Sequence, residues 1–304
     1  MRIILIGQAA FAEKTLDKLL DKGEEVLAVF CPPDKSEGKF DPVKQRAIEL
    51  SIPVYQQKSM KGPEVLEKFK ELDADLAILA FVTQIVPLPV FNAPKHGSIC
   101  FHPSLLPKYR GGSAINWTLI NGETKTGVSW FWVDDGIDTG PLLIQKEVQI
   151  GPEETTGTLY FNKLFPLGIE AIDEAIALIK AGNPPRIVQD ESQANYDPLC
   201  RDEHSGIDWS RPAQEIYDHI RGCDPQPGAS TIWQGEEIRL YNCSLQKSRG
   251  SATPGQVVAI GGGIVSIAVN GGAVVAKKIR GESGKVAADE LAGQVGIQVG
   301  SQLG

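Results

Sequence analysis

Short apolar runs alternate with helical stretches in the first 80 residues, and this alternation limits the possible folds more than any other feature. Ile3–Ile6, Val26–Phe30 and Leu76–Ala80 are continuous apolar runs, which indicates strands buried on both faces. Between them, Ala12–Leu20 and Glu64–Leu72 carry apolar residues at helical spacing. Strands that alternate with helices imply parallel pairing and right-handed crossovers, so the sequence predicts an α/β sheet.

The first strand and helix have the order of a dinucleotide-binding unit but lack its glycine fingerprint. Residues 7–12 read GQAAFA, with one glycine where such a site uses three. We therefore exclude NAD as the ligand of this unit.

Residues 95–112, KHGSICFHPSLLPKYRGG, contain a histidine at the expected end of a strand. Alternate side chains of a strand share a face, so Cys100 and His102 point the same way. Pro103 ends the strand because it has no N–H to donate. A histidine at a strand's carboxyl end stands where open α/β sheets bind ligands, although a structural cap is the alternative. Arg110 is expected either to bind an anion or to be a solvated cation.

A second loop concentrates negative charge. The apolar strand Ser129–Trp132 is followed at 133–140 by VDDGIDTG, with three aspartates and two glycines. A carboxylate beside a histidine is the usual way to orient an imidazole and raise its basicity, whereas a solvated acidic turn is the alternative for any one aspartate. Together the two loops favour a functional site.

The C-terminal third has a different pattern. Residues 183–206 are rich in polar residues and proline and lack periodicity, which is typical of a linker. Glycine turns then separate five short strand candidates, which predicts a small β-barrel. These are 230–233, 237–241, 256–260, 264–269 and 273–279. We expect two domains, 1–200 and 201–304.

Composition narrows the classes of partner. Five cysteines without CxxC spacing are typical of reduced thiols in a cytoplasmic protein. No segment approaches the roughly 20 apolar residues that span a bilayer, and Cys100-X-His102 without a distant partner motif predicts no metal site. The net charge is −8, and residues 201–304 carry ten Lys/Arg against eleven Asp/Glu. That balance disfavours tRNA as a partner, because phosphate contacts require a basic surface.

HPSLLPKYRGG followed by DDGIDTG resembles the formyltransferases that use 10-formyltetrahydrofolate, and most closely the hydrolase domain of 10-formyltetrahydrofolate dehydrogenase. The likeness continues through MRIILIGQAAF, FVTQIVP, NAPKHGSI, SAINWTLINGE and IRGCDPQPGA. It implies a Rossmann-like formyltransferase domain followed by a small OB-like C-terminal β-barrel. It also implies 10-formyltetrahydrofolate as cosubstrate and a small-molecule amine, or water, as acceptor.

The resemblance also assigns roles to individual residues. His102 is expected to stabilise the tetrahedral oxyanion and to transfer a proton to the folate nitrogen, while Asp138 holds the imidazole and contacts the folate. Cys100 occupies the third catalytic position. The family has an asparagine there, and the dehydrogenase-type relatives have an aliphatic residue. A thiol is a weaker hydrogen-bond donor than the asparagine amide. The loop 81–87 is expected to bind the pteridine through Gln84, Ile85 and Val86.

Three functions remain open at this point. Formyl transfer to an amine is favoured, because the chain ends at residue 304 without the carrier and aldehyde dehydrogenase domains of the dehydrogenase-type relatives. Hydrolysis to formate and tetrahydrofolate is the second, and the change to Cys100 favours it. The third is a folate-binding module that has lost catalysis, against which the retention of His102 and Asp138 speaks. Cys100 as a formyl-accepting nucleophile is a further, less favoured alternative to a small buried residue.

Overall fold

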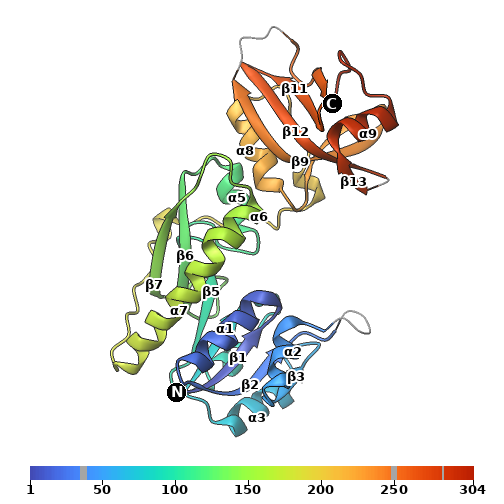
Figure 1. Ribbon diagram of the computed structural model, residues 1–304. Coiled ribbons are helices and arrows are strands. Elements are labelled where there is room, and N and C mark those ends of the chain that lie inside the picture. The colour runs from blue at the N-terminus through green and yellow to red at the C-terminus, as the bar shows by residue number, and fades with distance from the viewer. Residues whose placement is uncertain (35–39, 248–251, 283) are drawn as a thin grey trace. The chain divides into compact units, whose positions relative to one another are not determined.

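The computed structural model describes residues 1–34, 40–247, 252–282 and 284–304, which form two compact units (Figure 1). The first unit consists of Met1–Gly112, Gly127–Val148 and Asn162–Tyr196. The second consists of Ser113–Thr126, Gln149–Phe161 and Asp197–Gly304. The second unit therefore includes two segments from the middle of the chain as well as its C-terminal third.

A seven-stranded sheet forms the centre of the first unit, with the strand order β3-β2-β1-β4-β5-β6-β7. From β3 to β5 all neighbouring strands are parallel, as the alternation predicts. The strands are β1 Arg2–Gly7, β2 Glu25–Cys31, β3 Val54–Gln56, β4 Leu76–Ala80, β5 Ser98–His102, β6 Lys125–Trp132 and β7 Leu142–Gln149. The expected early strands are confirmed as β1, β2 and β4, whereas the three residues of β3 are too few to show a pattern.

Strand β6 breaks the parallel arrangement. It runs antiparallel to β5, with His102 opposite Ser129 and Ile99 opposite Trp132. The sheet is therefore mixed, with parallel strands from β3 to β5 and an antiparallel neighbour at β6. The helix between them, α5 (Ala114–Ile120), belongs to the second unit.

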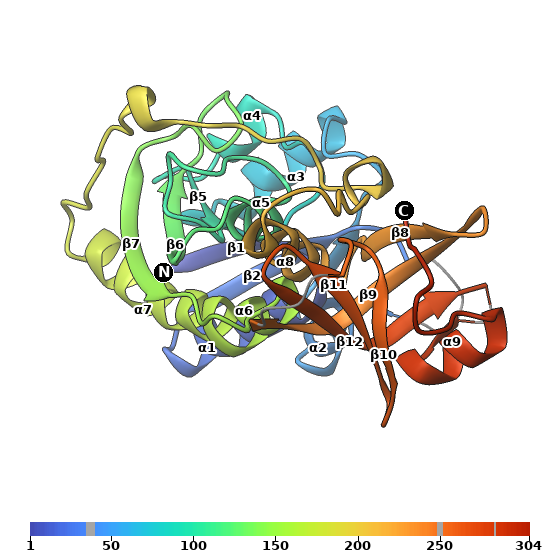
Figure 2. The same cartoon turned by 90° about the horizontal axis from the view of Figure 1, so that it is seen from above.

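Helices cover both faces of this sheet. Figure 2 shows α1, α2 and α7 on one face and α3 and α4 on the other. Their bounds are α1 Ala9–Asp21, α2 Pro42–Glu49, α3 Pro63–Leu72, α4 Leu88–Phe91 and α7 Phe165–Lys180. A π-helical turn at Tyr160–Leu164 leads into α7, and Pro166 fits within the first turn of that helix.

Aromatic packing fixes the orientation of β5. Phe101 stacks on Phe11 of α1, with ring centroids 4.1 Å apart, and lies against Gly168 of α7, where an added Cβ would come within 2.5 Å of its ring. Phe101 therefore points to the α1 and α7 face. Because side chains alternate, Cys100 and His102 point to the opposite face, as the sequence predicts.

The second unit is built on an antiparallel sheet in the order β10-β11-β12-β9-β8, with β13 beside β12. The strands are β8 Ala229–Trp233, β9 Glu236–Lys247, β10 Val257–Gly261, β11 Ile264–Val269, β12 Gly272–Gly281 and β13 Gly284–Ala287. All five expected strands are confirmed. Helices α6 (Thr156–Leu159), α8 (Ala213–Cys223) and α9 (Ala288–Val295) complete this unit. An OB-like barrel remains a prediction.

None of the helices that the structure describes has the length and apolar character needed to cross a bilayer.

Candidate active site

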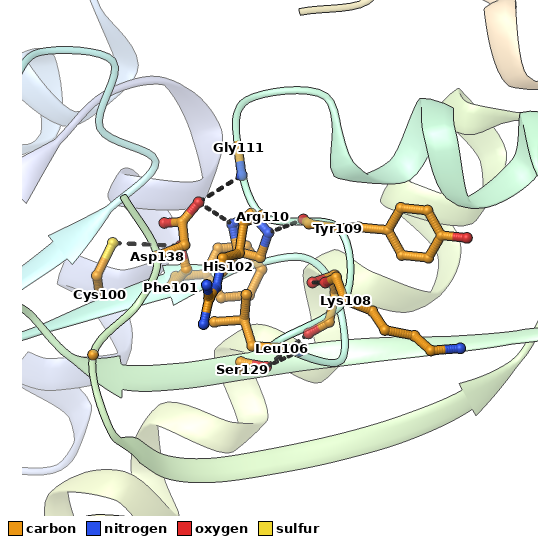
Figure 3. Close-up of polar contacts among 12 residues, drawn as sticks. Cys100, Phe101, His102, Leu106, Lys108, Tyr109, Arg110, Gly111, Ser129 and Asp138 are labelled. Carbon is orange, nitrogen blue, oxygen red and sulfur yellow. Dashed lines mark hydrogen bonds and ion pairs between the residues drawn. The ribbon is translucent and has the colours of Figure 1, made fainter. Parts of the chain in front are cut away.

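His102 is the last residue of β5, and both nitrogens of its ring face a polar group. The side chain is buried, with 5% of the residue exposed. Nε2 lies 2.7 Å from the carbonyl oxygen of Tyr109, and Nδ1 lies 3.5 Å from Oδ2 of Asp138 (Figure 3). A carbonyl oxygen can only accept, so we assign a proton to Nε2. Nδ1 is thus the ring nitrogen available for proton exchange.

The Asp138 carboxylate links the two loops that the sequence singled out. Its Oδ2 faces His102 and also accepts a hydrogen bond of 2.8 Å from the backbone N–H of Gly111, so one oxygen joins the imidazole to the loop after β5 (Figure 3). The structure therefore brings His102 and Asp138 together, as predicted.

The two groups that contact the imidazole come from residues with left-handed backbone. Tyr109 has φ +58° and Asp138 has φ +57°. This conformation costs a non-glycine residue roughly 1–2 kcal/mol, although aspartate tolerates it better than most. The surrounding contacts must therefore hold both loops in place.

Arg110 contributes to that support. It is 7% exposed, and its guanidinium donates to both carboxylate oxygens of Glu191 at 2.9 and 2.7 Å. These hydrogen bonds lower the pKa of the Glu191 carboxyl below its usual value. The alternative of a solvated cation is wrong for Arg110, because its side chain is buried and four of its five N–H groups donate to Gln189 and Glu191.

Cys100 lies two residues before His102 and is half-buried. It is paired with Leu79 of β4 on one side and with Phe131 of β6 on the other. Its thiol lies 3.6 Å from the carbonyl oxygen of Phe101, and burial, followed by the negative charge of Asp138, raises the pKa of the thiol well above its usual value. The group is therefore a neutral thiol near neutral pH, which makes it a poor nucleophile.

The loop after β4 begins at the same edge of the sheet, because Leu79 is the partner of Cys100 in β5. Ile85 is 73% exposed, and Val86 packs partly against the core. Gln84 directs its side-chain amide elsewhere, donating to the carbonyl oxygens of Gln57 at 3.0 Å and Lys58 at 3.3 Å. The loop thus presents an apolar side chain to solvent while the Gln84 amide braces the loop itself.

Two cavities lie apart from these residues. One, of about 480 Å³, is lined by α1 and the start of α7 and includes Lys14 and Phe165. The other, of about 520 Å³, belongs to the second unit and includes Ile120 and Asp218. The described part of the chain also contains no cluster of three His, Cys, Asp or Glu side chains suited to a metal ion.

Sequence reasoning missed the residues that support the histidine. Tyr109 acts through its backbone carbonyl, which no side-chain pattern reports. Gln189 and Glu191 lie in the segment interpreted as a linker, whose composition gave no sign that it packs against the site.

Comparison with known proteins decides the family. Residues 1–175 match the family described as formyl transferase, and residues 200–293 match the formyl transferase C-terminal domain. The chain belongs to the formyl transferase family. The predicted resemblance is thereby confirmed.

Two relatives show how far the likeness extends. The chain is 40% identical to the cytosolic 10-formyltetrahydrofolate dehydrogenase of Xenopus laevis over 301 residues, which covers 94% of this chain and 33% of that protein. The chain therefore spans about a third of the length of such relatives. It is 38% identical to the methionyl-tRNA formyltransferase of Trichlorobacter lovleyi over 299 residues, covering 96% of this chain and 94% of that protein.

Solved structures confirm the fold. HypX from Aquifex aeolicus in complex with tetrahydrofolic acid has a TM-score of 0.72 at 20% identity, covering 98% of this chain and 48% of that one. WlaRD, a sugar 3N-formyl transferase, has a TM-score of 0.71 at 20% identity, covering 91% of this chain and 97% of that one. Both units of the chain therefore follow an architecture known among formyl transferases.

Proposed function

We propose that this protein transfers a formyl group from 10-formyltetrahydrofolate to a small-molecule amine. The proposal is carried by the approach of His102 Nδ1 to Asp138 at 3.5 Å at the carboxyl end of β5, in a chain of the formyl transferase family. The relatives named 10-formyltetrahydrofolate dehydrogenase, at about 40% identity, support this folate as the donor.

The proposed step moves one carbon between two nitrogens. The amine nitrogen attacks the formyl carbon, and negative charge builds on the formyl oxygen in the tetrahedral intermediate. His102, protonated on both nitrogens, makes a hydrogen bond from Nδ1 to this oxygen, and it transfers that one proton to folate N10 as the C–N10 bond breaks and the formyl C=O re-forms. The amine's proton passes to a water that Asp138 holds. Nε2 keeps its proton throughout and donates it in a hydrogen bond to the Tyr109 carbonyl, which fixes the plane of the ring.

The pteridine is assigned to the loop 81–87, with Ile85 and Val86 as apolar contacts and the backbone at Gln84 as a hydrogen-bonding edge. The exposure of Ile85 supports this assignment, because a flat heteroaromatic ring would cover it on binding. Cys100 and Asp138 then lie on the formyl side. We assign this chemistry to a catalytic domain of residues 1–200 and an OB-like fold to a C-terminal domain of residues 201–304, in a cytoplasmic protein.

Hydrolysis of 10-formyltetrahydrofolate to formate and tetrahydrofolate is the second candidate. The neutral thiol of Cys100 supports it, because a thiol holds the formyl oxygen less firmly than an amide. The acceptor is a separate question. The net charge of residues 201–304 disfavours tRNA, but the likeness to a methionyl-tRNA formyltransferase along nearly its whole length keeps methionyl-tRNA among the acceptors to be tested.

Turnover of 10-formyltetrahydrofolate, followed with and without an acceptor, separates these functions. The proposal predicts that release of tetrahydrofolate depends on an added amine and yields a formylated product. Equal turnover in the absence of amine identifies a hydrolase. Folate binding without any turnover contradicts both reactions and leaves a binding module.

A further inference from the structure

Gln189 connects the two loops that hold the imidazole. We propose that Gln189 is a positioning residue of the formyl-transfer site, an inference that rests on the proposed function. Its side-chain Nε2 donates to the carbonyl oxygens of Asp138 at 2.9 Å and of Gly140 at 2.7 Å. Its Oε1 accepts from Nη2 and Nε of Arg110 at 2.8 and 3.3 Å. One amide therefore joins the loop of Asp138 to the residue that follows Tyr109.

All hydrogen-bonding capacity of this amide is used within the protein. Both N–H bonds and both lone pairs of Gln189 have partners, and the residue is 4% exposed. It therefore does not touch substrate, and it acts through the groups that it holds. Only an amide side chain fits these partners. A glutamate carboxylate lacks the two N–H donors, and a methionine thioether lacks both the donors and the carbonyl acceptor.

Gln189 bonds directly to one of the two left-handed residues beside His102 and reaches the other through the Arg110 side chain. The bond to the Asp138 carbonyl fixes the backbone at φ +57°, which directs the carboxylate toward His102 and Gly111. On the other side, Arg110 follows Tyr109, whose φ of +58° turns its carbonyl toward Nε2.

Asn195 strengthens the same connection six residues later. Its side-chain Oδ1 accepts from the Tyr109 N–H at 2.7 Å, and its carbonyl accepts from the Arg110 N–H at 3.1 Å. The segment 189–195 thus braces both loops, with Gln189 as the residue that reaches each of them.

A merely structural amide and a positioning amide predict different results. Loss of a structural amide lowers stability and leaves the folded fraction fully active. Loss of a positioning amide lowers kcat in folded protein by more than it changes KM for the folate, because the imidazole is misplaced while the loop 81–87 is intact. It also changes the ¹⁵N shifts of the His102 ring nitrogens in the free protein, since these report its partners.

The test uses Gln189→Glu and Gln189→Met, with Gln193→Met as the matched control. Gln193 lies four residues on in the same segment, and its amide donates to Oδ2 of Asp190 at 2.6 Å. We expect kcat to fall about 10- to 100-fold in both Gln189 variants, in the range typical of residues that orient a catalytic group, and the control to stay within twofold. Gln189→Glu retains the size and the acceptors for Arg110, so it serves if Gln189→Met does not fold.

The two readouts keep the inference separate from the proposed function. If the unaltered protein does not consume 10-formyltetrahydrofolate, the proposed function fails. The ¹⁵N chemical shifts of the His102 ring nitrogens then still decide the role of Gln189. Unchanged ring shifts in a folded Gln189 variant, or an unchanged kcat in an active one, overturn the inference.

Discussion

His102 and Asp138 meet although their loops leave β5 and β6 at opposite ends. β6 is antiparallel to β5, and the N–H of Val133, where the Asp138 loop starts, donates to the carbonyl of Ser98 at 3.0 Å, at the beginning of β5. Along β5, the distance from Ser98 to His102 is about 13 Å. The loop must therefore return along the sheet before Asp138 reaches the histidine, so the geometry of the pair depends on how this loop is closed.

Gly140 closes the loop, and its replacement tests this dependence. A Cβ at Gly140 would lie 1.7 Å from the carbonyl oxygen of Trp132, so Gly140→Ala forces the base of the loop apart. We expect at least a tenfold loss of activity and a destabilisation of about 1–3 kcal/mol, as in overpacked sites. Gly293→Ala in α9, where an added Cβ meets nothing within 4 Å, is the control. Full activity in Gly140→Ala is incompatible with the account. Turnover and thermal unfolding measure both effects.

Cys100 is the position where this chain departs from the expected pattern. We expect Cys100→Asn to raise the rate of transfer to an amine roughly tenfold, because an amide adds a firm donor near the formyl oxygen. Cys100→Ala should change turnover by no more than about threefold, since the neutral thiol is not a nucleophile. A complete loss of activity in Cys100→Ala would instead identify a thioester route. Single-turnover rates in both variants give the answer.

The reactivity of the Cys100 thiol depends on the charge of Asp138. Burial and then the Asp138 carboxylate raise the pKa of this thiol, so removing the negative charge lowers the pKa and increases the thiolate fraction at a given pH. We expect Asp138→Asn to accelerate alkylation of Cys100 by iodoacetamide between pH 8 and 9, a range near the ordinary cysteine pKa of about 8.5. Asp135→Asn, an exposed aspartate of the same loop, is the control. Mass spectrometry of the Cys100 peptide follows the reaction, and equal rates in the two variants would show that the carboxylate is distant.

Ile85 tests the assignment of the folate-binding loop. The side chain is 73% exposed, and a bound pteridine would cover it. Burial of such a side chain contributes about 1.5–3 kcal/mol, so Ile85→Asn should weaken folate binding about tenfold or more without loss of thermal stability. Ile48→Asn carries the same change at an isoleucine of α2 that is 56% exposed. Titration calorimetry with tetrahydrofolate compares the two, and equal affinities would place the pteridine elsewhere.

Much of the architecture could be predicted because it depends on local pattern. Apolar runs identified β1, β2 and β4, and the alternation within β5 placed Cys100 and His102 on one face, which the packing of Phe101 on the other face confirms. The three residues of β3 were missed because they leave no periodic signal. The sequence led to no prediction for the direction of β6, because its apolar residues identify a strand but not the way it pairs with β5.

The candidate site divides in a similar way. His102 and Asp138 could be found because their side chains carry acid–base chemistry and each lies at the end of an apolar strand or in the loop that follows one. Gln189 could not, because a glutamine in a polar segment gains its role only from the carbonyl groups that folding brings to it. The Tyr109 carbonyl is also invisible in sequence, since it depends on a left-handed backbone conformation.

The rate of 10-formyltetrahydrofolate consumption by His102→Ala, compared with the unaltered protein, tests the central claim most directly. His96→Ala, at an exposed histidine just before β5, carries the same substitution outside the site. Since His102 supplies the proton at the reacting centre, we predict a fall of about 100- to 10,000-fold for His102→Ala and no more than a twofold change for His96→Ala. Full activity of a folded His102→Ala protein would contradict the account.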